Sequence, residues 1–191
     1  MRERAARGRA CAVPVGQFLG TDILPPLVAH ARKVCARPDW TFHTTKDFEI
    51  PAPEASADFV CFLSLFTHLL HEDIYRYLAA AKRVLKPSGR IVFSYLDFAV
   101  PSHWAVFEQT LADRDPDRVL NQFISKDGIA SWCQHLRLEI SAIHDGHVPW
   151  INLVKSFHYV DGRKASGVVE FGQSVCVLTH APGHPAPANG A

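Results

Sequence analysis

Three features of this 191-residue chain could carry chemistry, and the first is Asp22 at the end of the apolar segment 18–23. In open α/β sheets, ligands bind beyond the carboxyl ends of the strands. An aspartate at such an end can accept hydrogen bonds from both hydroxyls of a ribose. Aspartate is also a good N-cap for a following helix. Both interpretations of Asp22 remain open, and one side chain can fulfil both.

The second feature is the group Ser64, Thr67 and His68, which follows the strongly apolar segment 59–63. Polar side chains at this point either face a ligand or cap the next helix, with the histidine satisfied by its neighbours. The third feature is segment 85–93, which reads Leu-Lys-Pro-Ser-Gly-Arg-Ile-Val-Phe. On its own this segment indicates only the end of a helix, a turn and a strand.

Apolar periodicity predicts the elements that must position these residues. The predicted strands are residues 18–23, 40–43, 59–63, 90–95, 136–140 and 171–179, and the predicted helices begin at Pro25, cover residues 74–85 and 102–111, and follow an N-cap at Ser125. The apolar run 59–63 predicts a strand that is covered on both faces. Because strands alternate with helices, the chain predicts a mainly parallel α/β sheet, and its last two strands predict an antiparallel hairpin at one edge.

The composition narrows the class of protein. A net charge of +1 provides no global field for a polyanion, so no nucleic-acid partner is expected. No apolar stretch is long enough to span a bilayer, and residues 1–9 lack the apolar part of a secretory signal, so no membrane is expected. The scattered cysteines form no Cys-x-x-Cys pair, and His144 and His147, two histidines in a predicted loop, are weak evidence for a metal site, so no metal is expected. We predict a cytoplasmic protein in which Cys61 and Cys176 are buried thiols.

Together, the three segments resemble the class I S-adenosylmethionine-dependent methyltransferases. Residues 18–23, Phe-Leu-Gly-Thr-Asp-Ile, match the second-strand motif of that family, aromatic-x-Gly-x-Asp-Ile. Residues 58–69 match its fourth-strand motif. Residues 85–93 match the Leu-Lys-Pro-Gly-Gly approach to its fifth strand, with Ser88 in place of the first glycine. The order and spacing of the three motifs agree with the family.

The resemblance implies that S-adenosylmethionine is the cofactor, and it implies a role for several residues. Asp22 would bind the ribose hydroxyls, and Ile23 would lie against the adenine. Asp47 and Phe48 occupy the usual position at the edge of the adenine. Ser64 would lie near the methionine part of the cofactor.

The resemblance also implies which residues face the reaction. Thr67 and His68 would face the cofactor or the substrate. Enzymes of this family mainly hold a nucleophile in line with an activated methyl group, so a catalytic base is optional. His68 is the first candidate base, followed by Tyr95 and Asp97 after the fifth strand.

Segment 58–69 lacks the Asn/Asp-Pro-Pro-Tyr sequence of methylases that act on planar amides or bases, which argues against such acceptors. The family builds its substrate pocket after the fifth strand, where aromatic and histidine side chains such as His103, Trp104 and Trp150 can line a site, so we expect a small-molecule acceptor.

The chain departs from the family at its start. The family begins with a strand and an acid-x-Gly-x-Gly-x-Gly loop, and no such loop precedes residue 18. The chain therefore predicts a Rossmann-like, mostly parallel sheet with helices on both faces, an antiparallel edge hairpin, and a first strand that is missing or truncated. We expect a truncated or disordered start at residues 1–15, a methyltransferase-like domain at residues 16–180 and a disordered tail at residues 181–191.

Two other hypotheses remain. The absent glycine loop also fits a non-catalytic α/β module, such as a pseudoenzyme subunit that borrows a strand from a partner, and a homo-oligomer stays open as well. A nicotinamide-dependent dehydrogenase would use the same kind of sheet. It ranks last, because its ribose acid needs a Gly-x-Gly-x-x-Gly loop upstream and this chain has none.

Overall fold

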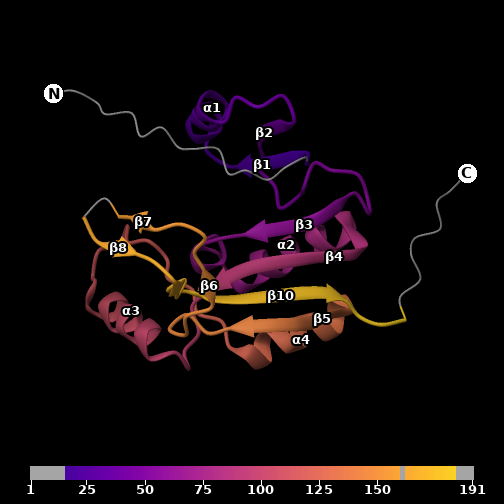
Figure 1. The fold of residues 1–191 in the computed structure, drawn as a ribbon. Helices are drawn as coiled ribbons and strands as arrows, with labels where there is room; N and C mark the ends of the chain where they lie inside the picture. Colours follow the sequence, from indigo (N-terminus) through magenta and orange to yellow (C-terminus); the bar gives the residue numbers. More distant parts are fainter. Residues whose placement is uncertain (1–15, 160–161, 184–191) are drawn as a thin grey trace, which may run out of the picture. The chain divides into compact units, whose positions relative to one another are not determined.

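The computed structural model describes residues 16–159 and 162–183, which divide into two compact units (Figure 1). The division falls between Ile50 and Pro51. Each unit is built around its own sheet, and each is described below by itself. No helix among the described residues combines the length and the apolar character needed to cross a bilayer.

The first unit consists of strand β1 (Phe18–Asp22), helix α1 (Pro25–Val34) and strand β2 (Trp40–Thr44). The two strands pair in parallel, so that Asp22 lies opposite Thr44 at their carboxyl ends. The ring centroids of Phe18 and Trp40 lie 4.7 Å apart across the pair. The predicted elements are confirmed, and every residue of β1 is half-buried or exposed.

The second unit contains a four-stranded mixed sheet, visible edge to edge in Figure 1. Its order is β3 (Ala57–Phe62), β4 (Leu85–Tyr95), β10 (Ser174–His180) and β5 (Leu138–His144). β3 and β4 are parallel, whereas β10 runs antiparallel to both of its neighbours. The predicted α/β class and the antiparallel pair at one edge are therefore confirmed. The sheet also shows that β10 enters between β4 and β5.

Four helices accompany this sheet: the short 3-10 helix η1 (Phe66–His68), α2 (His71–Val84), α3 (Pro101–Ala112) and α4 (Lys126–Leu136). α2 packs on β4, α4 packs on β5, and the two helices contact each other, so they share one face of the sheet. The side chains between them and the sheet form the core; those buried completely include Ile74, Leu78, Ile91, Phe93, Ile129, Cys176 and Leu178. Within this unit, taken by itself, α2 and α4 cover one face of the sheet.

Because α2 and α4 cover one face of this sheet, side chains of β3 are buried on that face and exposed on the other. Successive side chains of a strand point to opposite faces of the sheet. Phe62 faces the helices, since its ring lies 5.5 Å from that of Tyr77 on α2. Phe59 and Cys61 point the other way, and both are exposed, Phe59 to 63%. The prediction of a strand covered on both faces is therefore wrong, as is that of a buried Cys61, whereas a buried Cys176 is confirmed.

The turn predicted around residues 86–89 is part of β4. In the pairing with β3, Ala57 lies opposite Leu85 and Phe59 lies opposite Arg90, so four residues of β4 bulge out between these pairs. A Cβ atom on Gly89 would lie 2.9 Å from the Ala57 carbonyl oxygen. The helix-stopping sequence thus ends α2, as predicted, but leads directly into the strand.

The remaining differences lie in the last third of the chain. β5 begins at Leu138 rather than 136, because α4 continues to Leu136 and ends at Arg137 in the left-handed conformation. Between β5 and β10 the structure has two short antiparallel pairs that the sequence did not predict. They are β6 (Ile151–Asn152) with β9 (Val168–Val169), and β7 (Phe157–His158) with β8 (Lys164–Ala165).

The bulge in β4 makes Gly89 a sensitive position. Gly89→Ala should lower the free energy of unfolding by about 1–3 kcal/mol, because the new methyl group must push against the backbone of β3. Urea denaturation followed by circular dichroism measures this. Gly16→Ala is the matched control, since a Cβ atom at Gly16 meets nothing within 4 Å. Equal stabilities for the two variants would contradict the close approach at Gly89.

Candidate active site

Asp22 lies at the carboxyl end of β1, and only one of its two carboxylate oxygens accepts a hydrogen bond from the described residues. Its Oδ1 accepts a hydrogen bond of 2.8 Å from the Leu24 backbone N–H. Leu24, not Asp22, is the N-cap of α1, and no side chain caps that helix. Asp22 therefore closes the turn between β1 and α1, while its Oδ2 makes no hydrogen bond to any residue that the structure describes. One oxygen stabilises the turn, and the other is available to a ligand.

The other residues predicted near the adenine follow the same two strands. Ile23 comes directly after Asp22, and its side chain is 62% exposed. Asp47 and Phe48 follow the carboxyl end of β2, where Asp47 is exposed and Phe48 is half-buried. The Thr45 backbone N–H donates to the Asp22 carbonyl oxygen at 3.0 Å, which ties the two strand ends together. The structure therefore brings these predicted residues to one edge of the first unit.

Ser64, Thr67 and His68 follow the carboxyl end of β3, in the second unit. Thr67 is buried, and its hydroxyl donates to the Ser64 carbonyl oxygen at 3.1 Å. The Thr67 carbonyl oxygen accepts the Gln122 backbone N–H at 2.7 Å. In this conformation Thr67 stabilises the turn after β3 and does not present its hydroxyl to solvent.

His68 differs from Thr67, because its side chain is exposed. Its Nδ1 lies 2.8 Å from the Leu120 carbonyl oxygen. A carbonyl oxygen only accepts hydrogen bonds, so Nδ1 carries a proton, and in the neutral form of the ring Nε2 is the nitrogen without one. This tautomer presents a nitrogen that can accept a proton.

Tyr95 and Asp97 lie beneath the surface, beyond the carboxyl end of β4. Tyr95 is completely buried, and its hydroxyl has no hydrogen-bond partner among the described residues. Burial, together with the nearby Asp97 carboxylate, holds the pKa of Tyr95 far above its ordinary value. The phenol therefore stays protonated at neutral pH. In the described conformation Tyr95 cannot take a proton from an acceptor.

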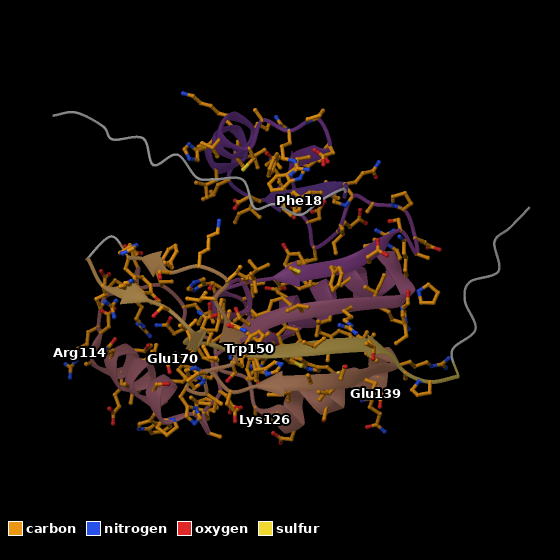
Figure 2. All side chains as sticks on the ribbon, viewed as in Figure 1. Phe18, Arg114, Lys126, Glu139, Trp150 and Glu170 are labelled. Atoms are coloured by element: carbon orange, nitrogen blue, oxygen red, sulfur yellow. The ribbon has the colours of Figure 1, made fainter. Side chains whose placement is uncertain are left out.

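Asp97 is buried and belongs to a polar network that reaches the surface at Lys126. Its Oδ1 accepts the Ala99 backbone N–H at 2.9 Å, and its Oδ2 lies 3.9 Å from Lys126 Nζ. Lys126, labelled in Figure 2 at the start of α4, also pairs with Asp145 at 2.7 Å. The hydrogen bond to Asp145 raises the pKa of Lys126. Of the three predicted bases, only His68 is exposed.

His103 completes this network as a neutral side chain. Its Nδ1 accepts the Asp97 backbone N–H at 2.8 Å, so its Nε2 carries the proton and donates to the Gly172 carbonyl oxygen at 2.9 Å. The ring is 1% exposed and uses both nitrogens. His103 thereby fastens the first turn of α3 to the segment that precedes β10.

Two residues at this edge were missed in the sequence. Ser94 accepts the Ser64 backbone N–H at 2.7 Å and donates to the Gln173 side-chain oxygen at 2.7 Å. Ser94 could have been found, because it is the one polar residue in an otherwise apolar strand end, Ile-Val-Phe-Ser-Tyr. Gln173 carries no such signal, since only the pairing of β10 with β4 brings it to the end of β3.

No group of three histidine, cysteine, aspartate or glutamate side chains in the described part of the chain could hold a metal ion. His144 stacks on Trp150, with ring centroids 4.1 Å apart and planes 12° apart. Trp150 lies where the short hairpins begin (Figure 2). This histidine is a packing partner of an aromatic ring in the structure.

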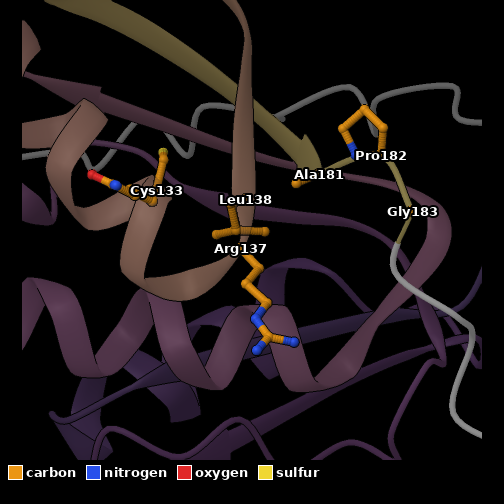
Figure 3. Close-up of a pocket in the computed structure, with 7 residues that line it drawn as sticks. Cys133, Arg137, Leu138, Ala181, Pro182 and Gly183 are labelled. Carbon is orange, nitrogen blue, oxygen red and sulfur yellow. The ribbon is translucent and has the colours of Figure 1, made fainter.

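A pocket of the second unit lies at the opposite edge of the sheet (Figure 3). It is lined by residues that include Cys133, Arg137 and Pro182. β5 begins beside it at Leu138, and β10 ends beside it, so the pocket lies at the amino ends of β3 and β4. Burial raises the pKa of Cys133 to about 11, so this thiol is not a reactive group at neutral pH. None of the predicted site residues lines this pocket.

The chain is similar to known methyltransferases in sequence and in fold. Residues 5–93 match the family model described as a methyltransferase domain. A putative methyltransferase from Haloferax volcanii, solved in complex with the Trm112 methyltransferase activator, is 18% identical with a TM-score of 0.61, over 90% of this chain and 75% of that chain. A SAM-dependent methyltransferase from Methanosarcina mazei is 17% identical with a TM-score of 0.55, over 85% of this chain and 81% of that chain.

A third solved structure comes from Synechocystis. Its magnesium protoporphyrin IX methyltransferase with bound SAH is 12% identical with a TM-score of 0.56, over 86% of this chain and 64% of that chain. At these identities the structures show the fold alone. With the family match, they confirm the predicted resemblance to class I methyltransferases, whose cofactor is S-adenosylmethionine.

The unpaired hydroxyl of Tyr95 leads to a test of its role. Tyr95→Phe should leave the free energy of unfolding unchanged or raise it by up to about 1 kcal/mol, because a buried hydroxyl without a partner costs energy. Ser174→Ala is the comparison, since this buried hydroxyl accepts the Gly146 backbone N–H at 3.1 Å. Its loss should cost about 1–3 kcal/mol. If chemical denaturation shows a larger loss for Tyr95→Phe than for Ser174→Ala, the Tyr95 hydroxyl is bonded after all.

Proposed function

We propose that this chain, which has the class I methyltransferase fold and matches the methyltransferase-domain model over residues 5–93, transfers a methyl group from S-adenosylmethionine to a small-molecule acceptor. The observation that carries the proposal is Asp22, which stands at the carboxyl end of a parallel strand with one carboxylate oxygen unused. Four thiols of the described residues, including the buried Cys133 and Cys176, are free, which supports a cytoplasmic location.

The residues present in the first unit fit the nucleoside part of the cofactor. The unused Oδ2 of Asp22 can accept a ribose hydroxyl. Ile23 offers an exposed apolar side chain for the flat face of an adenine, and Asp47 offers an exposed carboxylate for its polar edge. In the second unit, taken by itself, Ser64 lies beside Thr67 at the carboxyl end of β3, and the family resemblance gives Ser64 a role toward the methionine part of the cofactor.

The second unit supplies the group that could move a proton. When bound, S-adenosylmethionine supplies an activated methyl group. An oxygen or nitrogen that receives this methyl group loses one proton. The His68 ring is exposed, and in its neutral form with Nδ1 donating to Leu120, Nε2 is the nitrogen that can accept this proton. Tyr95 and Asp97 would act by holding the strand end in place. The partly exposed rings of Phe98 and Trp104, beyond β4, support an apolar acceptor.

Calorimetry with S-adenosylhomocysteine tests the cofactor site. Asp22→Asn keeps an oxygen for the Leu24 N–H and removes the charge, so α1 should remain in place while affinity falls about tenfold, the effect expected for one charged hydrogen bond. Asp58→Asn is the matched control, because Asp58 forms a surface ion pair with Lys86 at 2.8 Å at the other end of β3. The proposal fails if the wild-type chain does not bind, or if Asp22→Asn binds as the control does.

A second function is favoured by the free sheet edges. Among the described residues β1 pairs only with β2, and β3 pairs only with β4, so each sheet ends in a strand with unpaired backbone groups. Such an edge is a template for a further strand. We propose as the alternative a non-catalytic, methyltransferase-like subunit that takes up a strand from a partner or from a second copy.

Light scattering separates these functions. A strand-borrowing subunit should form a dimer or larger assembly at micromolar concentration, because an apolar edge such as that of β3 is unstable in water. A monodisperse monomer that binds S-adenosylhomocysteine would exclude the alternative. An assembly without affinity for S-adenosylhomocysteine would instead favour it.

A further inference from the structure

Ser64 adopts a backbone conformation that a serine avoids without support. Its φ is 55°, in the left-handed region, where an L-residue other than glycine is strained by roughly 1–2 kcal/mol. It stands between the end of β3 and the 3-10 helix η1. Two other described residues share a positive φ without being glycine, Ala55 and Arg137, and neither lies at the carboxyl edge. Strain of this kind persists where surrounding contacts hold it.

The contacts that hold Ser64 come from residues far along the chain. Its N–H donates to the Ser94 hydroxyl at 2.7 Å, and that hydroxyl donates in turn to Gln173 Oε1 at 2.7 Å. The Ser64 hydroxyl lies 3.4 Å from the same Oε1. The Thr67 hydroxyl donates to the Ser64 carbonyl oxygen at 3.1 Å. Every polar group of Ser64 is thus engaged.

The Ser94 hydroxyl connects Ser64 to Gln173 through two hydrogen bonds. It is completely buried, so its hydroxyl has no water to compete with the Ser64 N–H. A hydroxyl that donates to one group and accepts from another is fixed in rotation. Because its one proton goes to Gln173, its lone pairs face Ser64. Without Gln173 the hydroxyl would be free to turn.

Gln173 is itself held on both sides. The preceding residue, Gly172, accepts from His103 Nε2 through its carbonyl oxygen at 2.9 Å. The following residue, Ser174, accepts the Gly146 N–H through its hydroxyl at 3.1 Å. Gly172 also donates its own N–H to the Gly146 carbonyl oxygen at 3.1 Å. The segment before β10 is therefore anchored to α3 and to the loop after β5.

We infer that Ser94 and Gln173 are positioning residues, which hold Ser64 in its left-handed conformation so that the segment from Ser64 to His68 is presented at the carboxyl edge. The inference rests on the proposed function, in which Ser64 contacts the methionine part of S-adenosylmethionine. The hydrogen bonds that run from the Ser64 N–H through the Ser94 hydroxyl to Gln173 are called the relay below. Without the relay, Ser64 relaxes to a negative φ, and both its hydroxyl and the following turn move. The conformation of Ser64 thereby depends on a glutamine 109 residues further along the chain, within the same unit.

The first test removes the relay and then removes the need for it. Ser94→Ala and Gln173→Ala should each weaken the binding of S-adenosylhomocysteine about tenfold in calorimetry, with circular dichroism to show that both variants are folded. Adding Ser64→Gly to Ser94→Ala should restore affinity to within about threefold of wild type, because glycine adopts a positive φ without support. Gln134→Ala, an exposed glutamine on α4, is the matched control and should bind as wild type.

The second test does not depend on the cofactor. Amide hydrogen exchange followed by nuclear magnetic resonance should show that the Ser64 N–H is protected in the wild-type chain and exchanges at least tenfold faster in Ser94→Ala and Gln173→Ala. Unchanged exchange would overturn the relay, whatever the chain binds. A wild-type chain that binds no S-adenosylhomocysteine while the exchange result holds would defeat the proposed function and not the relay.

The outcome of the double variant decides what the relay does. If Ser64→Gly with Ser94→Ala regains affinity, the relay serves the backbone conformation, as inferred. If the double variant binds as weakly as Ser94→Ala alone, the positioning role is overturned, because the conformation by itself then does not account for the loss.

Discussion

The second unit depends on the antiparallel entry of β10 between β4 and β5. Because β10 runs against both neighbours, its first residues lie beside the last residues of β4 and β5. Ser174 thus stands opposite Tyr95, and Val175 stands opposite both Ser94 and His144. A parallel strand in the same place would bring its last residues to this edge instead. The direction of β10 is the reason that Gln173 can reach the end of β3.

The carboxyl edge of this sheet is stiffened by buried polar groups as well as by apolar packing. Asp97 accepts a backbone N–H and faces Lys126, which in turn pairs with Asp145 after β5. Asp97 is the buried member of this network, so removing Lys126 would leave a buried carboxylate without the cation it faces. His103 adds a neutral link to Gly172. At this edge, the ionisable side chains of Asp97 and His103 therefore hold loops in place, whereas that of His68 is exposed.

The two units carry different kinds of candidate site residue. The first unit offers a carboxylate, an exposed isoleucine and an exposed aspartate at the ends of two parallel strands, which are groups suited to a nucleoside. The second offers a strained turn, a proton-accepting imidazole and exposed aromatic rings, which are groups suited to a reacting centre. Local turns position the groups of the first unit, whereas long-range contacts position those of the second. Substitutions far from the reacting groups should therefore matter more in the second unit.

The sequence by itself determined the elements and the order of the motifs. Periodicity predicted strands at residues 18–23 and 90–95 and a helix at residues 74–85, which correspond to β1, β4 and α2. It also predicted the N-cap at Ser125, whose side chain accepts the Gly128 N–H at 3.3 Å. These features depend on residues close together in the chain, so a short window contains the whole signal. The cofactor class followed from the same local motifs.

Only the tertiary structure decided which side chains are buried and which meet. Phe59 and Cys61 look like core residues in sequence, yet they lie on the sheet face that α2 and α4 leave open. Tyr95 stands at a strand end, as predicted, but packing places its hydroxyl beneath the surface. The contact between Ser94 and Gln173 joins residues on neighbouring strands whose pairing no local pattern specifies. Burial and long-range hydrogen bonds depend on how the strands are ordered, and that order is a property of the folded chain as a whole.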